Sequence, residues 1–406
     1  MGGPETLAAD DAGSSEGGAD QGVEPGEGAV PGDAVVPVDA PVPCGAPSAT
    51  ATDVYVDRAS GGAGLGNAAC PFHSILEASA LSWSPASGKR TIHVAAGAYS
   101  ELNVIRLADH VVLAGAGPAA LHVTGGGVCS GGIGNCVFEL EGGAEAFGFT
   151  VDANGSNGVV TNASSAKPPL VHHAVVTGST GATAGILVRG SADVGPQVSC
   201  TANAVGLHAI GTGNVHVLAP TAADTNAFSD NQTHGIHMEA SAVLAFDGGE
   251  LARNTVNGIR LAGITSSVQT ISGAYVHENG AAGLFVSNAA SASVRGSRFE
   301  GNRIGLVFTR TTANTLDLGT TAAPGHNVFG TKAGGSRNTV AGVCGYVVPA
   351  NTTISAVGNL WSACVPTYVS VASCDVVPTS GYLDIIFAPA ALAVLPLDTS
   401  GCVPPP

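Results

Sequence analysis

The sequence is poor in charged and aromatic side chains. Only 11% of its 406 residues are charged and 5% are aromatic, whereas about a quarter of the residues in an average soluble domain are charged. The 14 basic residues stand against 30 acidic ones, which excludes the basic face that a nucleic-acid-binding protein needs. No apolar run reaches the roughly 18 residues that cross a bilayer, so no transmembrane helix is expected. Collagen periodicity and coiled-coil heptads are absent as well.

Glycine and short apolar runs are abundant instead. The chain contains 58 Gly, and 45% of its residues are hydrophobic, so the chain as a whole is not disordered. A chain of this length is able to bury a large core. Many short β-branched runs separated by glycine predict a repetitive β architecture with many turns.

The acidic charge is concentrated at the start of the chain. Residues 1–43 hold nine acidic residues and no Lys or Arg, and they are rich in Gly, Ala and Pro. Such a segment repels itself and has no apolar period, which predicts a disordered, flexible tether. We therefore divide the chain into the tether 1–43, a folded body 44–330, and a cysteine-rich C-terminal cap and tail 331–406.

The cysteines predict a protein that lives outside the cytoplasm. There are nine, of which Cys129 and Cys136 flank a glycine-rich loop and can pair locally. A zinc site is the rival interpretation, but no CxxC or Cys/His spacing supports it, so disulfides and an oxidising compartment are favoured. No leader follows Met1, so the export signal is expected outside this chain. One hypothesis is that Met1 replaces a lipid-modified cysteine, as in a lipoprotein tethered to the cell surface.

A repeat occupies the middle of the chain. Each copy reads apolar-x-x-Asn, then two or three residues, then Gly followed by Ile or Leu. Successive asparagines are 28, 23, 25 and 23 residues apart. The repeat asparagines are Asn203, Asn231, Asn254, Asn279 and Asn302.

The repeat predicts stacked short strands. Apolar residues after each Gly alternate with period two, which indicates a strand with one buried face. A unit this short cannot bury that face alone, so the units must stack. Asn tolerates a left-handed backbone and caps turns, and stacked Asn side chains can bond along the axis. Cys200 aligns with apolar residues of the next units, which predicts a buried, unpaired thiol.

This pattern resembles the right-handed parallel β-helix of pectate-lyase-like proteins, over roughly residues 90–330. Residues 53–101 also resemble a bacterial domain of unknown function that opens many β-helix proteins, with a helix led by Pro71-Phe72. The resemblance implies an all-β fold, a single right-handed parallel β-helix with a short N-terminal capping helix and a C-terminal cap. The helix is expected at about residues 72–81, with Phe72, Ile75, Leu76 and Ala80 covering the open end of the stack.

One row of outward-facing residues is the candidate binding site. The alternation of the repeat strands turns His208, His237, Arg260 and Phe285 outward on adjacent coils, with Glu239 one step further along its strand. Cationic and aromatic groups in a row suit a sugar chain that carries carboxylates. The competing interpretation is an ordinary solvated sheet face, because isolated exposed apolar residues are common.

Catalysis is the alternative. In the pectate-lyase-like fold it needs paired carboxylates or a calcium-assisted base, and the polygalacturonase strings are missing from this sequence. The carboxylate pairs that the sequence offers are Asp247 with Glu250 and Asp230 with Glu278. No metal site is expected: His172 and His173 are neighbours on a strand and should point to opposite faces. No cofactor is expected either, with calcium only in the case of a lyase.

The sequence thus favours a non-enzymatic, exported or surface-tethered β-helix. The partners expected for it are an extracellular polysaccharide or another cell-surface component. The alternatives are a polysaccharide lyase or glycoside hydrolase acting on an acidic glycan, and a structural spacer. A monomer that binds no nucleic acid is expected.

Overall fold

The computed structural model describes most of the chain beyond residue 43. The chain divides into units 1–42 and 43–406, and every described residue belongs to the second. The predicted tether and much of the C-terminal segment lie outside the described residues. The described ranges are 44–45, 51–62, 64–81, 88–162, 167–219, 221, 225–262, 267–287, 290–309, 315–329, 337–346, 354–361, 368–370 and 383–388.

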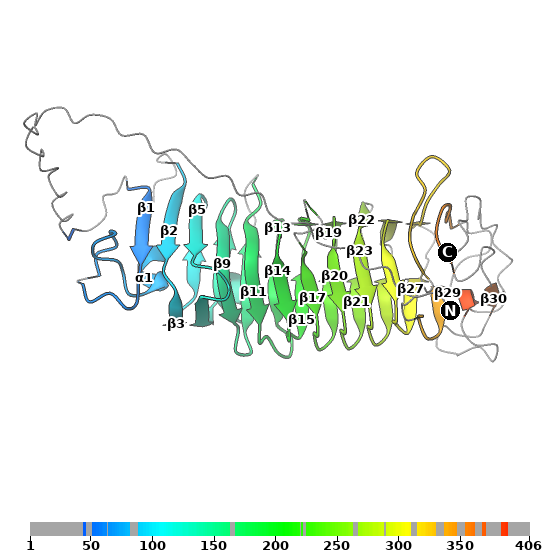
Figure 1. Cartoon of the computed structure of the whole chain (residues 1–406), viewed down its shortest axis with the longest axis horizontal. Coiled ribbons are helices and arrows are strands. Elements are labelled where there is room, and N and C mark those ends of the chain that lie inside the picture. Colours follow the sequence, from blue (N-terminus) through cyan, green and yellow to red (C-terminus); the bar gives the residue numbers. More distant parts are fainter. Residues whose placement is uncertain are drawn as a thin grey trace, which may run out of the picture. The chain divides into compact units, whose positions relative to one another are not determined.

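The second unit is a right-handed parallel β-helix, as predicted. Short strands stack along one axis, coil upon coil (Figure 1). Each central coil contributes three strands: two belong to an 18-stranded sheet and one belongs to a 13-stranded sheet. Among the described residues no helix is long and apolar enough to cross a membrane.

The 18-stranded sheet contains two rows of strands. In the earlier coils, β9 (Glu145–Asp152) and β11 (Leu170–Thr177) run through both rows as single long strands. The first row otherwise contains β1 (Asp53–Val56), β2 (Arg90–Val94), β5 (Val111–Gly115), β13 (Ala192–Val194), β16 (Asn214–Val217), β19 (Val243–Phe246), β22 (Val268–Ser272), β25 (Ser291–Arg295) and β28 (Leu316–Asp317). The second row contains β3 (Gly97–Glu101), β6 (Leu121–Gly125), β14 (Val198–Thr201), β17 (Ala227–Ser229), β20 (Gly249–Ala252), β23 (Ala274–His277) and β26 (Arg298–Glu300).

The 13-stranded sheet forms the third row. It continues past residue 330, where the sequence analysis ended the folded body, because three later strands add to the same parallel ladder. Its strands are β4 (Ile105–Leu107), β7 (Gly127–Val128), β8 (Asn135–Glu141), β10 (Asn157–Asn162), β12 (Ala184–Val188), β15 (Val205–Ala209), β18 (His234–Met238), β21 (Asn257–Leu261), β24 (Ala282–Val286), β27 (Ile304–Thr309), β29 (Ala341–Tyr346), β30 (Tyr368–Ser370) and β31 (Leu383–Ala388). Of the strands that the structure describes in this sheet, β7 alone pairs antiparallel, with β8.

The core lies inside the coils. Along the third row the strand register places one apolar side chain directly above another, and all of them are buried. Because each coil buries its inner face only against its neighbours, stability arises between coils rather than within them. The stacked residues of this row include Ile186, Leu207, Ile236, Ile259, Leu284 and Leu306.

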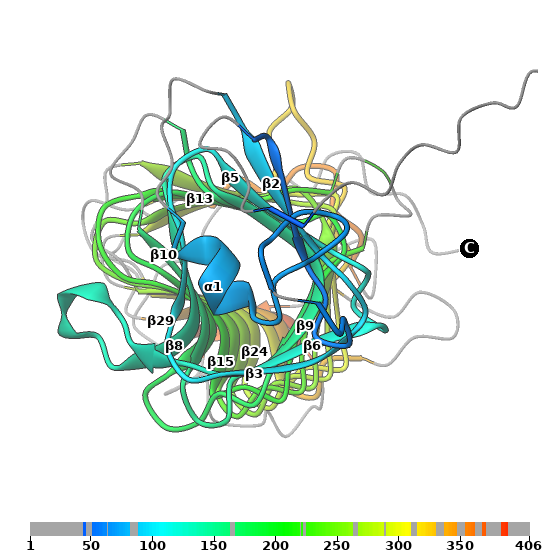
Figure 2. The same cartoon turned by 90° about the vertical axis from the view of Figure 1, so that its left-hand side faces the viewer.

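The one α-helix among the described residues, α1 (Ile75–Ser79), lies at the open N-terminal end of the stack (Figure 2). It is shorter than the expected span 72–81, because Ser74 caps it by accepting a hydrogen bond from the Glu77 backbone N–H. Ile75 and Ala78 are buried, whereas Ala80 is exposed and does not cover the core as expected. The Glu101 carboxylate accepts hydrogen bonds from the Ser74 hydroxyl at 2.7 Å and from the Ile75 backbone N–H at 2.8 Å.

The repeat asparagines form one buried ladder. In each step the backbone N–H of one Asn donates to the side-chain oxygen of the Asn one coil further on, at 3.0 to 3.1 Å from Asn203 through Asn302. The sequence analysis gave the left-handed backbone to the asparagines themselves. The structure gives it to the residue before each, such as Asp230 and Arg253, which leaves the Asn side chain free to point along the axis.

The ladder is longer than the repeat revealed. Asn302 continues it to Asn338, with the same backbone contact at 3.0 Å. A second ladder joins Ser297, Asn327 and Asn359, again at 3.0 Å for each step. The sequence analysis missed both extensions because 36 residues separate Asn302 from Asn338, well beyond the spacing of the repeat.

The described cysteines include the predicted Cys129–Cys136 disulfide and the predicted unpaired Cys200. Cys129 pairs with Cys136, and Cys44 pairs with Cys70. Cys200 is free and fully buried, and it pairs in register with the core residue Phe228. Burial raises the pKa of its thiol, so the thiol stays protonated and unreactive in the native state.

We expect Cys200→Val to be nearly neutral, within about 1 kcal/mol in the free energy of unfolding, because volume and polarity barely change. Cys200→Asp should destabilise severely, because it buries a charge without a partner. Urea unfolding of both variants measures this. Rapid alkylation of Cys200 in the folded protein would contradict the burial on which the prediction rests.

Asn254→Ala should lower the urea midpoint. Its side-chain oxygen accepts from the Asn231 backbone N–H at 3.1 Å and from the Asn231 amide at 2.9 Å, and its own amide donates to the Phe228 carbonyl at 3.0 Å. Each buried group left without a partner costs roughly 1–3 kcal/mol. Asn214→Ala is the control, because that side chain is exposed. Equal midpoints for the two variants would show that the ladder does not stabilise the fold.

Candidate functional site

The outer face of the 13-stranded sheet carries the predicted row of residues. The register pairs His208 on β15 with His237 on β18, and His237 with Arg260 on β21. Arg260 in turn pairs with Phe285 on β24. Adjacent positions in such a row are about 4.8 Å apart, so one ligand can touch several coils at once.

The same row is apolar on both sides of this group. Leu187 precedes His208 in register, and Val307 follows Phe285; both are buried. Each belongs to a small apolar cluster that is separate from the main core. Phe285 packs against the second of these clusters and is half-buried, rather than standing free on a solvated face. The polar residues therefore lie between two apolar positions of the row, Leu187 and Val307.

His208, His237 and Glu239 come together as a compact group. Their ligand atoms all lie within 4.8 Å of one another. The Nε2 atoms of His208 and His237 are 3.4 Å and 3.3 Å from the two carboxylate oxygens of Glu239. The two imidazole rings stack in parallel, with centroids 4.7 Å apart and planes 2° from parallel. Three potential metal ligands thus meet at one point of the row.

One nitrogen of each imidazole in this group, the Nε2 atom, lacks a hydrogen-bond partner. The Nε2 atoms of His208 and His237 are buried, and neither makes a hydrogen bond despite the nearby carboxylate, because the contacts are poorly aligned. His237 is only 6% exposed, whereas the Glu239 side chain is 45% exposed. Buried polar atoms without partners are rare in native proteins, and each asks for an explanation.

The environment keeps the imidazoles neutral. Burial, followed by the nearby positive charges of His208, His234 and Arg260, lowers the pKa of His237 to about 3. Burial also lowers the pKa of His208, against the opposing effect of Glu239. At neutral pH each ring therefore carries an unprotonated nitrogen, which is the form that binds metal ions.

His234 joins the group, although the sequence analysis missed it. It begins β18, is 6% exposed, and meets His237 edge to face with centroids 5.0 Å apart. Burial and the charge of Arg260 lower its pKa to about 4. It lies three residues before His237, which in an ideal strand would place it on the opposite face. The signal that could have found it is its place next to the turn that precedes the strand.

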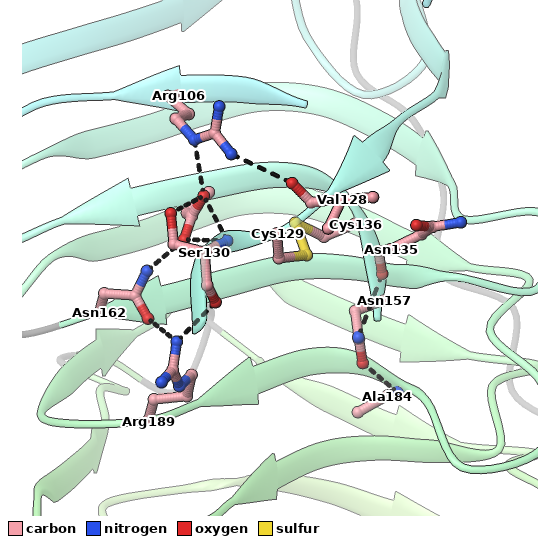
Figure 3. Close-up of a disulfide and its surroundings, with 11 residues drawn as sticks. Arg106, Val128, Cys129, Ser130, Asn135, Cys136, Asn157, Asn162, Ala184 and Arg189 are labelled. Carbon is pink, nitrogen blue, oxygen red and sulfur yellow. Dashed lines mark hydrogen bonds and ion pairs between the residues drawn. A yellow bond between two sulfur atoms is a disulfide. The ribbon is translucent and has the colours of Figure 1, made fainter. Parts of the chain in front are cut away.

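At the N-terminal end of the row, the buried Glu139 is held by an ion pair and several hydrogen bonds. Glu139 on β8 is fully buried and carries an ion pair with Arg106 at 2.9 Å. It also accepts hydrogen bonds from the Ser130 hydroxyl at 3.1 Å and from the Asn162 amide. Burial works against the charged form, but these contacts outweigh it and lower the Glu139 pKa. The Cys129–Cys136 disulfide closes the adjacent hairpin (Figure 3), so this polar cluster is satisfied by its own residues.

The carboxylate pairs suggested by the sequence have different surroundings. Asp247 and Glu250 line one cavity of about 460 Å³ on the 18-stranded sheet, together with Tyr275. Asp230 instead binds Arg253 through two contacts, at 2.8 Å and 2.9 Å. The first pair therefore faces a common space, and in the second pair the charge of Glu278 acts on the same Arg253 that Asp230 binds.

The expectation for His172 and His173 was wrong. Their Nδ1 atoms lie 2.6 Å apart instead of on opposite faces. His173 has a positive φ of 47°, and the pairing with β9 skips it, so the alternation of the strand is interrupted at this point. His172 stacks on Phe147 and contacts Glu145 at 3.2 Å.

Comparison with known proteins gives one family and several distant folds. A family model described as "Periplasmic copper-binding protein (NosD)" matches residues 148–363, a little over half of the chain. No curated protein matches. Among solved structures, the A-module of mannuronan C-5 epimerase AlgE6 from Azotobacter vinelandii is 16% identical, with a TM-score of 0.47, covering 82% of this chain and 94% of that one.

Two further structures are similar at the same level. The AlgE4 A-module from Azotobacter vinelandii is 14% identical, with a TM-score of 0.44, covering 79% of this chain and 91% of that one. The periplasmic alginate epimerase AlgG is 12% identical, with a TM-score of 0.39, covering 75% of this chain and 77% of that one. Similarity this low carries no information about the activity of this chain.

Proposed function

The chain belongs to the NosD family of periplasmic copper-binding proteins, and from this premise we propose that it is a non-enzymatic β-helix that binds a transition metal ion through His208, His237 and Glu239. The family also supports a location outside the cytoplasm. The two disulfides of the described residues suit an oxidising compartment. Tethering to a surface through residues 1–43 stays a prediction, as does the monomeric state.

The observation that carries the proposal is the pair of buried Nε2 atoms without hydrogen-bond partners. A metal ion would satisfy both of them at once. Ligands about 2.1 Å from a tetrahedral ion lie about 3.4 Å apart, and the two imidazole-to-carboxylate contacts, at 3.3 Å and 3.4 Å, have this spacing. The two Nε2 atoms lie within 4.8 Å of each other on parallel rings, so the rings must turn toward a common ion. The sequence analysis expected no metal here, because it did not bring the Glu239 carboxylate to the Nε2 atoms of both histidines.

The donor types narrow the kind of ion. Two imidazoles and one carboxylate suit Cu²⁺, Zn²⁺, Ni²⁺ and Fe²⁺, and they are poor ligands for Ca²⁺, which prefers oxygen. Among the divalent ions Cu²⁺ forms the strongest complexes with nitrogen ligands. A bound ion would supply a Lewis-acid centre with room for a further ligand, because His208, His237 and Glu239 provide three of the four positions of a tetrahedral site.

The fold holds the three ligands in place before any ion arrives. His208 and His237 lie on paired strands of the sheet, so their separation is set by the ladder. Glu239 follows β18, and its backbone N–H donates to the Ala209 carbonyl at 2.9 Å. The ladder therefore fixes the backbone of the ligands before binding, and the side chains alone must turn toward the ion, which limits the entropic cost of binding.

Titration of the full chain with Cu²⁺ or Zn²⁺ should show one tightly bound ion. Glu239→Gln and His237→Ala should each weaken binding by roughly 10–100-fold or more, as measured by calorimetry. His216→Ala is the matched control, because His216 is a half-exposed histidine that pairs with Asp247 on the other sheet. Circular dichroism checks the fold of each variant. An unchanged affinity in Glu239→Gln and His237→Ala would refute the proposed site.

Catalysis is the second candidate function, and the cavity that Asp247 and Glu250 line is the observation that favours it. We expect the protein to release neither unsaturated nor reducing ends from a panel of acidic and neutral polysaccharides. Product that forms with the native chain and disappears in Asp247→Asn and Glu250→Gln would instead establish a lyase or hydrolase.

A further inference from the structure

Arg260 has no acidic partner in the described part of the chain. Its Nη1 atom lies 3.5 Å from the Nε2 atom of His234, and the strand register places Arg260 beside His237. Other half-buried arginines differ: Arg295 binds Asp317 at 2.6 Å, and Arg298 binds Glu300. A guanidinium beside neutral imidazoles is electrostatically unsatisfied, because nothing negative that it touches balances its charge.

The charge balance worsens when a metal ion binds. Without an ion, Glu239 and Arg260 contribute one negative and one positive charge. A divalent ion adds two positive charges and the neutral imidazoles add none, so the group becomes doubly positive beside the buried ring of His237. Like charges close together in a medium of low dielectric constant repel strongly. An anion between the ion and the guanidinium would remove this repulsion.

We propose, on the premise of the metal site proposed above, that Arg260 and the bound ion together hold the carboxylate of an acidic sugar. The carboxylate occupies the coordination position that the three protein ligands leave open. The guanidinium fork matches the two oxygens of a carboxylate. Arg260 is thus the residue that makes the site selective for an anionic ligand.

The next residue in the row indicates what the carboxylate is attached to. Phe285 pairs with Arg260 in register, on the side away from the histidines. It is half-buried against Ala282, Ile304 and Val307, so it presents a rigid apolar surface to whatever reaches beyond Arg260. A sugar ring has an apolar face that packs on an aromatic side chain. A uronic acid, which joins such a ring to a carboxylate, fits both residues.

The two ligands should therefore bind cooperatively. The carboxylate should tighten the ion and the ion should tighten the carboxylate by the same factor, because coupling is reciprocal. Typical coupling of this kind changes affinity by roughly 5–150-fold. Arg260→Gln should bind the ion at least as tightly as the native chain when no carboxylate is present, and it should lose the enhancement.

The experiment measures the affinity of the protein for Zn²⁺ by calorimetric titration. The titration is done without additive and with galacturonate, acetate or glucose. Visible absorption of the Co²⁺-loaded protein gives an independent signature, because a new ligand on the ion changes the spectrum. We expect galacturonate to tighten Zn²⁺ most, acetate less, and glucose not at all. Arg253→Gln is the control: its guanidinium binds Asp230 on the other sheet, and the enhancement should survive.

The outcomes separate this inference from the proposed function. Absence of Zn²⁺ and Cu²⁺ binding under every condition would overturn both. Metal binding that galacturonate and acetate leave unchanged would overturn the carboxylate site alone, and the metal site would stand. Equal enhancement by acetate and galacturonate would support the carboxylate contact and overturn the role of the sugar ring.

Discussion

The strand register of the 13-stranded sheet is the constraint on which the structure depends. Parallel pairing sets each residue directly above its equivalent in the next coil, so positions some 23 to 29 residues apart in sequence become neighbours in space. The asparagine ladder reinforces this register with a repeated hydrogen bond inside the turns. Such a chain of bonds is stronger than its separate members, because each polarises the next. The rows of side chains on either face follow from it.

The candidate site differs from the rest of the row because it buries polar atoms that make no hydrogen bond. The outer row of the sheet is apolar at Leu187 and again at Val307, and the Glu139 cluster is fully partnered. Between them, His208 and His237 bury nitrogens that make no hydrogen bond. Burying such atoms costs free energy that the fold does not recover, and an external ligand is the simplest compensation. The same reasoning applies to the guanidinium of Arg260.

The sequence alone predicts the features that repeat from coil to coil. It misses those that depend on the local backbone at a single position. The coils, the ladder and the buried Cys200 follow from residues that recur in aligned positions. The limits of α1 depend on a single cap, Ser74, which shortens the helix. The convergence of Glu239 on the two histidines depends on the turn after β18, where Ala240 has a positive φ. A periodic pattern does not predict a local backbone change of this kind. The sequence therefore predicted the five candidate residues but not how their side chains converge.

The ladder also separates two properties that are usually coupled in a protein: loop length and strand position. The steps between its asparagines vary from 23 to 28 residues within the repeat and reach 36 residues at Asn338, yet the connecting bond stays at 3.0 to 3.1 Å. Extra residues are therefore absorbed in the connections without shifting any row. A lineage built on this scaffold can lengthen or replace the loops beside the outer face while the ligand positions stay where they are. Insertions in these loops can then change which ligands the outer face recognises, while the stacked strands beneath it stay the same.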